Sequence, residues 1–211
     1  MKQFRNISTL IFDLGGVLIN LEKQNCIDAF HHLGFYEIEQ YLDNFQHKGI
    51  FIALERGEIT AEEFINHCLK YCPLAKSEDD IINAWCAYLL EIPIQKLEML
   101  CLLKKQFRII MLSNTNPIHF PFIERTQFEG QGYSLDQCFD KLYLSHELKT
   151  AKPEGLVFEK LLLEEALEPS QFLFLDDGIN NINKANEFGI QTYHVAPKED
   201  LGFLLNANTW I

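Results

Sequence analysis

The sequence contains few basic residues for its length. Lysine and arginine together number 18, against 30 aspartates and glutamates, so the formal net charge at pH 7 is −12. Binding to the phosphate backbone of a nucleic acid requires a concentrated basic face. We therefore expect no nucleic-acid partner. A small anionic ligand is compatible with this charge if a cation, a lysine or helix N-termini supply a local positive potential.

Long apolar runs and paired cysteine motifs are also absent. No segment is long enough to cross a bilayer, and the apolar stretch near the N-terminus is short and interrupted by Asp13, unlike a signal peptide. Cys68 and Cys72 lie one helical turn apart, but the second ligand pair of a structural zinc site is missing. We expect buried free thiols, no membrane partner and a cytoplasmic location.

Short apolar runs alternate with helical patterns in much of the chain. Apolar runs without polar alternation are typical of parallel strands that helices cover on both faces. Such an alternation predicts right-handed crossovers. We therefore expect an α/β fold with a doubly wound, mainly parallel, Rossmann-like sheet. The expected strands are 9–14, 107–113, 141–145, 172–177 and a weaker 190–195, and the expected helices among them are 153–167 and 179–189.

Residues 20–92 interrupt this alternation. They contain amphipathic helical patterns and no convincing strand, and Thr60 with Glu63 predicts a capping box at the start of one helix. We expect a helical domain over 20–92, inserted after the first strand, and an α/β core domain made of residues 1–19 and 93–211. The helices expected in the insertion are 23–34, 38–49, 60–72 and 78–90.

Polar residues follow the expected strands. Ligands of open α/β sheets bind beyond the carboxyl ends of the strands. Asp13 ends the first apolar run, and two glycines follow that allow close approach of the backbone. Ser113 and Asn114 end the second run and can donate hydrogen bonds to an oxyanion. The same edge of the sheet should therefore carry a carboxylate and several donors.

Charged residues complete this set after the third and fourth runs. Lys152 precedes a proline-started helix, and the pair Asp176 and Asp177 ends the fourth run. Singly, such pieces are common as turns, helix caps or surface residues. Together they provide a carboxylate nucleophile, hard oxygen ligands for Mg²⁺ and donors for phosphoryl oxygens. This combination indicates phosphoryl transfer.

The chain resembles the haloacid dehalogenase superfamily, whose phosphatases carry four such motifs in this order. The matching pieces are "FDLGGVL", "LSNTN", "AKP" and "FLDD", and the helical insertion resembles the type-1 cap of that family. The stretch "LERGEITAEEF" (54–64) is similar to a stretch of small bacterial sugar-phosphate phosphatases. Among these, enzymes acting on α-D-glucose 1-phosphate look nearest, because they too have Asp-Leu-Gly where most relatives have Asp-x-Asp.

The resemblance implies a role for each phosphate-binding position. Asp13 resembles the nucleophile that forms an aspartyl-phosphate. Ser113 and the backbone N–H of Asn114 would hold the phosphoryl oxygens, and Lys152 would neutralise charge and orient Asp13. The expected substrate is a small phosphorylated metabolite, such as a sugar phosphate. The sequence leaves open whether the protein is a monomer or a homodimer.

The resemblance also implies a Mg²⁺ site. Asp13 and Asp177 would supply carboxylate ligands, with Asp176 beside Asp177 as support, and Gly15 would supply a backbone carbonyl. Side by side, Asp176 and Asp177 point in different directions, so we expect only one of them to bind the metal directly.

Gly15 departs from the family pattern, because that position usually carries an acid and base carboxylate. General acid and base catalysis typically contributes about 10²–10⁴-fold. Its absence predicts a preference for anomeric or aryl phosphates and a slow second half-reaction, unless a group such as Glu22 or His119 replaces it. Two alternatives also stay open: a catalytically impaired binding protein with this fold, and a haloacid dehalogenase-type hydrolase.

Overall fold

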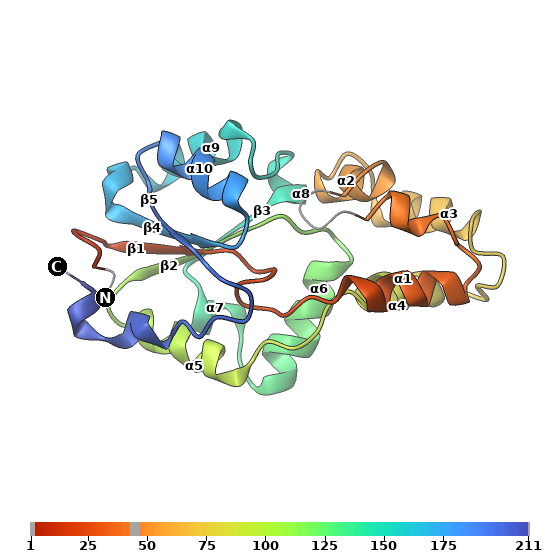
Figure 1. Cartoon of the computed structure of the whole chain (residues 1–211), viewed down its shortest axis with the longest axis horizontal. Coiled ribbons are helices and arrows are strands. Elements are labelled where there is room, and N and C mark those ends of the chain that lie inside the picture. The colour runs from red at the N-terminus through yellow and green to blue at the C-terminus, as the bar shows by residue number, and fades with distance from the viewer. Residues whose placement is uncertain (1–2, 43–46, 211) are drawn as a thin grey trace.

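The protein is an α/β sandwich with a helical insertion at one end of its sheet (Figure 1). The computed structural model describes residues 3–42 and 47–210. The sheet is parallel throughout, with the strand order β3-β2-β1-β4-β5, which confirms the expected doubly wound fold. The strands are β1 Thr9–Phe12, β2 Arg108–Ser113, β3 Lys141–Leu144, β4 Phe172–Asp176 and β5 Gln191–His194.

Helices cover both faces of the sheet and form the insertion. The α-helices are α1 Lys23–His32, α2 Ile50–Glu55, α3 Ala61–Leu69, α4 Glu78–Cys86, α5 Ile94–Leu103, α6 His119–Ile123, α7 Leu135–Cys138, α8 Ser145–Leu148, α9 Gly155–Glu165 and α10 Ile179–Glu187. A π-helical turn spans Glu124–Phe128, and short 3₁₀ turns span Ile38–Gln40, Glu129–Gln131, Pro169–Gln171, Gly202–Leu205 and Ala207–Thr209.

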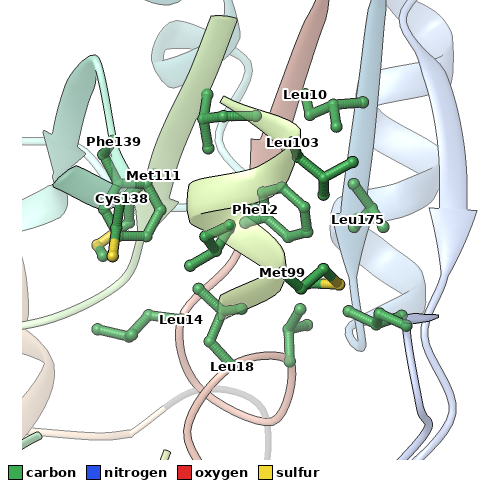
Figure 2. Packing of buried hydrophobic residues seen from close by; sticks show 14 of the residues in the cluster. Leu10, Phe12, Leu14, Leu18, Met99, Leu103, Met111, Cys138, Phe139 and Leu175 are labelled. Carbon is green, nitrogen blue, oxygen red and sulfur yellow. The ribbon is translucent and has the colours of Figure 1, made fainter. Parts of the chain in front are cut away.

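Successive residues of the central strands enter two different apolar cores. On β1, Leu10 and Phe12 pack in one cluster with Met99 and Leu103 of α5 (Figure 2), whereas Ile11 packs in another with residues of α9 and α10. This alternation follows from the two-residue period of a strand. It explains why the strands appear in the sequence as continuous apolar runs.

The helical insertion has an apolar core of its own. Its centre is Phe51, whose ring lies 5.0 Å from the ring of Phe64 and 4.9 Å from that of Trp85, both edge-on. Edge-on pairs of this kind add to the free energy that burial contributes. The cysteines of the insertion, Cys26, Cys68, Cys72 and Cys86, are buried and free, as expected.

The expected helix over 38–49 is wrong for the described residues 38–42. They form only a 3₁₀ turn, and the Lys48 N–H donates to the Tyr41 carbonyl at 2.8 Å. The rest of the expected helix includes residues 43–46, which lie outside the described residues. Gly49, with φ +56°, then opens α2, a helix that the sequence patterns did not predict.

Two chain crossings connect the insertion to the sheet, and they lie side by side. Leu21 and Leu89 form an antiparallel bridge, the Glu22 N–H donates to the Tyr88 carbonyl (2.9 Å), and the Leu90 N–H donates to the Asn20 carbonyl (2.9 Å). The insertion therefore leaves and rejoins the sheet at one place. Within the described residues, no helix is both long enough and apolar enough to span a bilayer.

Candidate active site

Three neighbouring strands deliver the site residues to one edge of the sheet. β1 lies between β2 and β4, with Phe12 in register with Met111 and with Leu175. The next residue, Asp13, is fixed by its N–H, which donates to the Leu175 carbonyl at 3.0 Å. The carboxyl ends of the first and fourth strands are therefore adjacent.

A buried lysine connects two of the carboxylates. The Nζ of Lys152 lies 2.9 Å from Oδ1 of Asp13 and 2.7 Å from Oδ2 of Asp176. Burial by itself would lower the pKa of this ammonium, but the two carboxylates outweigh it and the pKa of Lys152 is raised. Lys152 is therefore a permanent cation at the floor of the site.

The side chain of Asn114 holds the backbone of Lys152. Its Nδ2 donates to the Lys152 carbonyl and its Oδ1 accepts from the Lys152 N–H, each at 2.8 Å. Because both ends of the amide are used in this way, the side chain of Asn114 positions Lys152. The backbone N–H of Asn114 is then the group left to meet a ligand, as the resemblance implies.

Asp176 and Asp177 have different surroundings. Asp176 accepts from Lys152, from the Gly178 N–H (2.7 Å) and from Nδ2 of Asn181 (2.9 Å), so its oxygens are already engaged. The carboxylate of Asp177 packs against Gly16 so closely that a Cβ on that glycine would lie 2.2 Å from Oδ2. The absence of a side chain at Gly16 is what lets Asp177 approach the end of β1.

The donor set of the site suits a divalent cation. Asp13, Asp176 and Asp177 each bring a carboxylate oxygen within 4.8 Å of the others. Burial, together with the charges of Asp176 and Asp177, raises the pKa of Asp13 despite the opposing effect of Lys152. Three carboxylates with one ammonium leave an excess of negative charge in a buried place, which a Mg²⁺ ion bound by these hard oxygen ligands would relieve.

These groups line one cavity of about 250 Å³ between the sheet and the helical insertion. The expected residues Asp13, Gly15, Ser113, Asn114, Lys152 and Asp177 all border it. Asp176 is fully buried behind Lys152. The structure thus brings the predicted site residues together.

The helical insertion adds a second set of lining residues that the sequence patterns did not identify. His47, Glu55 and Tyr88 border the same cavity as Asp13. Glu55 is buried, and its Oε1 lies 3.7 Å from Nε2 of His47. Burial raises the pKa of Glu55 to about 8. The sequence signal for Glu55 was a carboxyl group in an apolar-rich segment. The sequence patterns did not predict α2, however, so Glu55 was not identified.

Of the two groups considered as substitutes for a carboxylate at Gly15, only His119 lines the cavity. Its Nε2–H donates to the Trp85 carbonyl (3.1 Å), its ring stacks on that of Trp85, and burial lowers its pKa to about 3. Glu22 instead caps α1 by accepting from the Gln24 N–H.

Direct contacts fasten the helical insertion to the core at the end of α2. The Ser145 hydroxyl lies 2.7 Å from the Glu55 carbonyl oxygen, Arg56 forms an ion pair with Glu154 (2.6 Å), and the Lys149 ammonium donates to the Gly57 carbonyl. α2 lies against α8 at this place (Figure 1). The hydrogen bond from Ser145 to the Glu55 carbonyl therefore fixes the backbone of Glu55 beside the cavity.

The glycine pair offers a direct test of this geometry. Gly16→Ala should lower the free energy of unfolding by ~1–3 kcal/mol, because φ is +69° and the new methyl group would collide with Asp177. Gly15→Ala is the matched control, since its Cβ meets only the end of the Leu21 side chain at 3.1 Å. Urea titration measures both, and equal effects of the two substitutions would refute the close approach of Asp177.

The raised pKa of Glu55 should appear in the pH dependence of stability. The folded state holds this proton up to about pH 8, whereas the unfolded state releases it near 4.5. The stability of the parent protein should therefore fall, relative to Glu55→Gln, by about 5 kcal/mol as the pH rises between these values. Urea titrations at several pH values test this, and parallel curves for the two proteins would contradict it.

Comparisons with known proteins agree with this geometry. The curated relative D-ribitol-5-phosphate phosphatase of Bacteroides thetaiotaomicron is 32% identical over 187 residues, which cover 89% of this chain and 91% of the relative. A haloacid dehalogenase (HAD) family enzyme from the same organism is similar in structure. It was solved as an aspartate-to-alanine mutant with magnesium and inorganic phosphate. Its TM-score is 0.91 at 36% identity, covering 95% of this chain and 99% of that one.

A HAD-like family hydrolase from Porphyromonas gingivalis is also similar, with a TM-score of 0.85 at 33% identity over 92% of this chain and 94% of that one. The family model of haloacid dehalogenase-like hydrolases matches residues 7–189, which include strands β1 to β4, the helical insertion and all the site residues. The protein therefore belongs to the haloacid dehalogenase-like hydrolase family.

Proposed function

We propose that the protein is a Mg²⁺-dependent phosphatase that hydrolyses a small phosphorylated polyol or sugar through an aspartyl-phosphate on Asp13. The observation that carries this proposal is the ion pair of Lys152 with Asp13 at the floor of the cavity. A carboxylate held by a buried ammonium has a fixed orientation and is ready to attack a phosphorus atom above it.

The chain supplies donors for the phosphoryl oxygens around Asp13. The Ser113 hydroxyl and the backbone N–H of Asn114 border the cavity, and Lys152 offsets negative charge. The N-terminus of α10 borders it as well, through Gly178 and Ile179, and the partial positive charge of a helix N-terminus favours an anion. These groups would hold the phosphoryl group while it moves between oxygens.

Asp13, Asp177 and the backbone carbonyl of Gly15 would hold the Mg²⁺ ion. The ion would offset the charge of the incoming phosphate in an acidic protein. Asp176 would act through Lys152 and Asn181 rather than on the metal, because those donors already occupy its oxygens.

A primary phosphate of a polyol or sugar is the substrate class that we favour. D-Ribitol 5-phosphate, which the curated relative's name gives as its substrate, is a primary alkyl phosphate. That chemistry differs from the anomeric and aryl phosphates expected from Gly15 alone. A cavity of about 250 Å³ suits a ligand of that size with ordered water.

The helical insertion would act as a cap that excludes water and contacts the substrate. Its separate apolar core supports a division into a cap over 20–92 and a core over 1–19 and 93–211. A dehalogenase function is less well supported, since it does not require the pair Asp176 and Asp177. A binding protein without activity would have no need for the buried pair of Lys152 and Asp13.

A phosphate-release assay tests the function directly. With Mg²⁺, D-ribitol 5-phosphate should be hydrolysed with a kcat/KM at least tenfold above that for α-D-glucose 1-phosphate, and EDTA or Asp13→Asn should abolish both activities. Asp13→Asn keeps the shape of the side chain but removes the nucleophile. Failure of the parent protein to release phosphate from any sugar or polyol phosphate would rule out the proposal.

Metal binding can be tested apart from catalysis. Asp177→Ala should weaken Mg²⁺ binding at least tenfold in calorimetry, because one of two carboxylate ligands is lost. Asn180→Ala is a suitable control, since Asn180 lines the same cavity with a neutral side chain. If Asp177→Ala binds Mg²⁺ as well as the control does, Asp177 is not a ligand.

A further inference from the structure

The side of the cavity opposite Asp13 decides how the leaving group receives a proton. In phosphoryl transfer, the attacking and leaving oxygens lie roughly in line with phosphorus. The leaving oxygen therefore faces away from Asp13, toward the helical insertion. Gly15, two residues after Asp13, has no side chain that could reach it. If the protein acts as the proposed phosphatase, the proton must come from another residue.

Besides Asp13, Lys152 and Asp177, four titratable side chains border the cavity in the described part of the chain, namely His47, Glu55, Tyr88 and His119. His119 is excluded as a base by its low pKa, and its Nε2–H is committed to the Trp85 carbonyl. Burial raises the pKa of Tyr88 to about 12, so it can donate a hydrogen bond but does not take a proton from water near neutral pH. Glu55 and His47 therefore remain as the candidates for the residue that supplies the proton.

We propose that the carboxyl group of Glu55 is the general acid and base of the reaction, in place of the carboxylate missing at Gly15. The inference rests on the proposed phosphatase function. It is supported by the position of Glu55 on the wall of the cavity that holds Asp13 and by its burial. The backbone of Glu55 is also fixed to the core through Ser145.

The surroundings of Glu55 favour a proton at rest. Its pKa of about 8 means that the carboxyl group is protonated at neutral pH, and a neutral group does not repel the incoming phosphate. Arg56, the adjacent residue, lowers this pKa only partly, and the guanidinium is paired with Glu154. The α3 helix packs Phe64 toward Phe51, while its Glu62 and Glu63 are exposed.

The other titratable or charged groups that face this region belong to the elements packed around it. They are His47 before α2, Tyr88 after α4, His119 of α6, His146 and Lys149 at α8, and Asp13, Lys152 and Asp177 across the cavity. His47 packs edge-on against Trp85 and Tyr88, which orients its ring beside Glu55.

One group can serve both half-reactions. In the first, Oδ of Asp13 bonds to phosphorus, the bond from phosphorus to the leaving oxygen breaks, and that oxygen takes the proton of Glu55. In the second, the Glu55 carboxylate takes a proton from water as the water oxygen bonds to phosphorus. The bond from phosphorus to Asp13 then breaks, which restores Asp13 and leaves Glu55 protonated. Both events occur on the side of phosphorus opposite Asp13.

Glu55→Gln tests this role by the dependence on leaving group and on pH. For D-ribitol 5-phosphate, we expect kcat to fall about 10²–10⁴-fold. For 4-nitrophenyl phosphate, whose leaving group needs no proton, the rate of phosphoenzyme formation in a single turnover should fall less than about tenfold. The decline of kcat/KM above about pH 8 in the parent protein should disappear in Glu55→Gln. Glu58→Gln, a neighbouring exposed change, is the matched control.

Other outcomes would overturn the inference. A rise in KM with unchanged kcat and pH profile would make Glu55 a substrate contact, and equal losses on both substrates would make it a structural residue. If the decline of kcat/KM above about pH 8 disappears in His47→Gln but persists in Glu55→Gln, His47 and not Glu55 supplies the proton.

Two further results keep the test independent of folding and of the proposed function. If Glu55→Gln does not fold, ¹³C NMR of the Glu55 carboxyl in the parent protein, assigned with Glu55→Asp, decides the matter. A midpoint near pH 8 supports the inference, and an ordinary midpoint near 4.5 overturns it. If the parent protein hydrolyses no phosphate monoester at all, the phosphatase proposal fails, whatever the pKa of Glu55.

Discussion

The ammonium group of Lys152 holds the floor of the cavity together. It lies within 3 Å of two carboxylates, that of Asp13 directly after β1 and that of Asp176 at the end of β4, and all three residues are buried. An unpaired buried carboxylate would be costly, so these two side chains can lie this close only because the cation is between them. The reciprocal hydrogen bonds of Asn114, the donors on Asp176 and the close approach of Asp177 to Gly16 all fix this arrangement, from segments that follow three different strands.

The core and the helical insertion supply different chemistry to the same cavity. The core contributes charge: carboxylates, one ammonium and the donors at the ends of β2 and α10. The insertion contributes Glu55 and Tyr88, which are both neutral near pH 7 because burial raises their pKa values. The end of α2 is attached to the core through Ser145, Arg56 and Lys149. A roof without net negative charge suits a phosphate substrate. It also provides a proton at the place where an in-line reaction needs one.

Much of this could be predicted from the sequence because it is local. Apolar runs identify the five strands, and a parallel sheet places the polar residues after them at one edge. The capping box of Thr60 and Glu63 is present as expected. The contributions of Glu55 and His47 could not be found in this way. Their function depends on how the insertion folds back over the sheet, and α2 begins after a glycine turn rather than at a recognisable helix signal. Likewise, in the sequence only the family resemblance favours Asp177 over Asp176 as the metal ligand, whereas in the structure three donors on Asp176 distinguish the two.

In the proposed reaction, Asp13 is the nucleophile that carries the phosphoryl group between two in-line displacements. The stereochemical course at phosphorus tests this most directly, and it does not require the intermediate to accumulate. A phosphorothioate ester made chiral at phosphorus with ¹⁶O and ¹⁸O would be hydrolysed in ¹⁷O-labelled water by the Mg²⁺-loaded enzyme, and the configuration of the released thiophosphate determined. Two displacements predict overall retention of configuration. Inversion would mean that water attacks the substrate directly, and Asp13 would then not be the nucleophile.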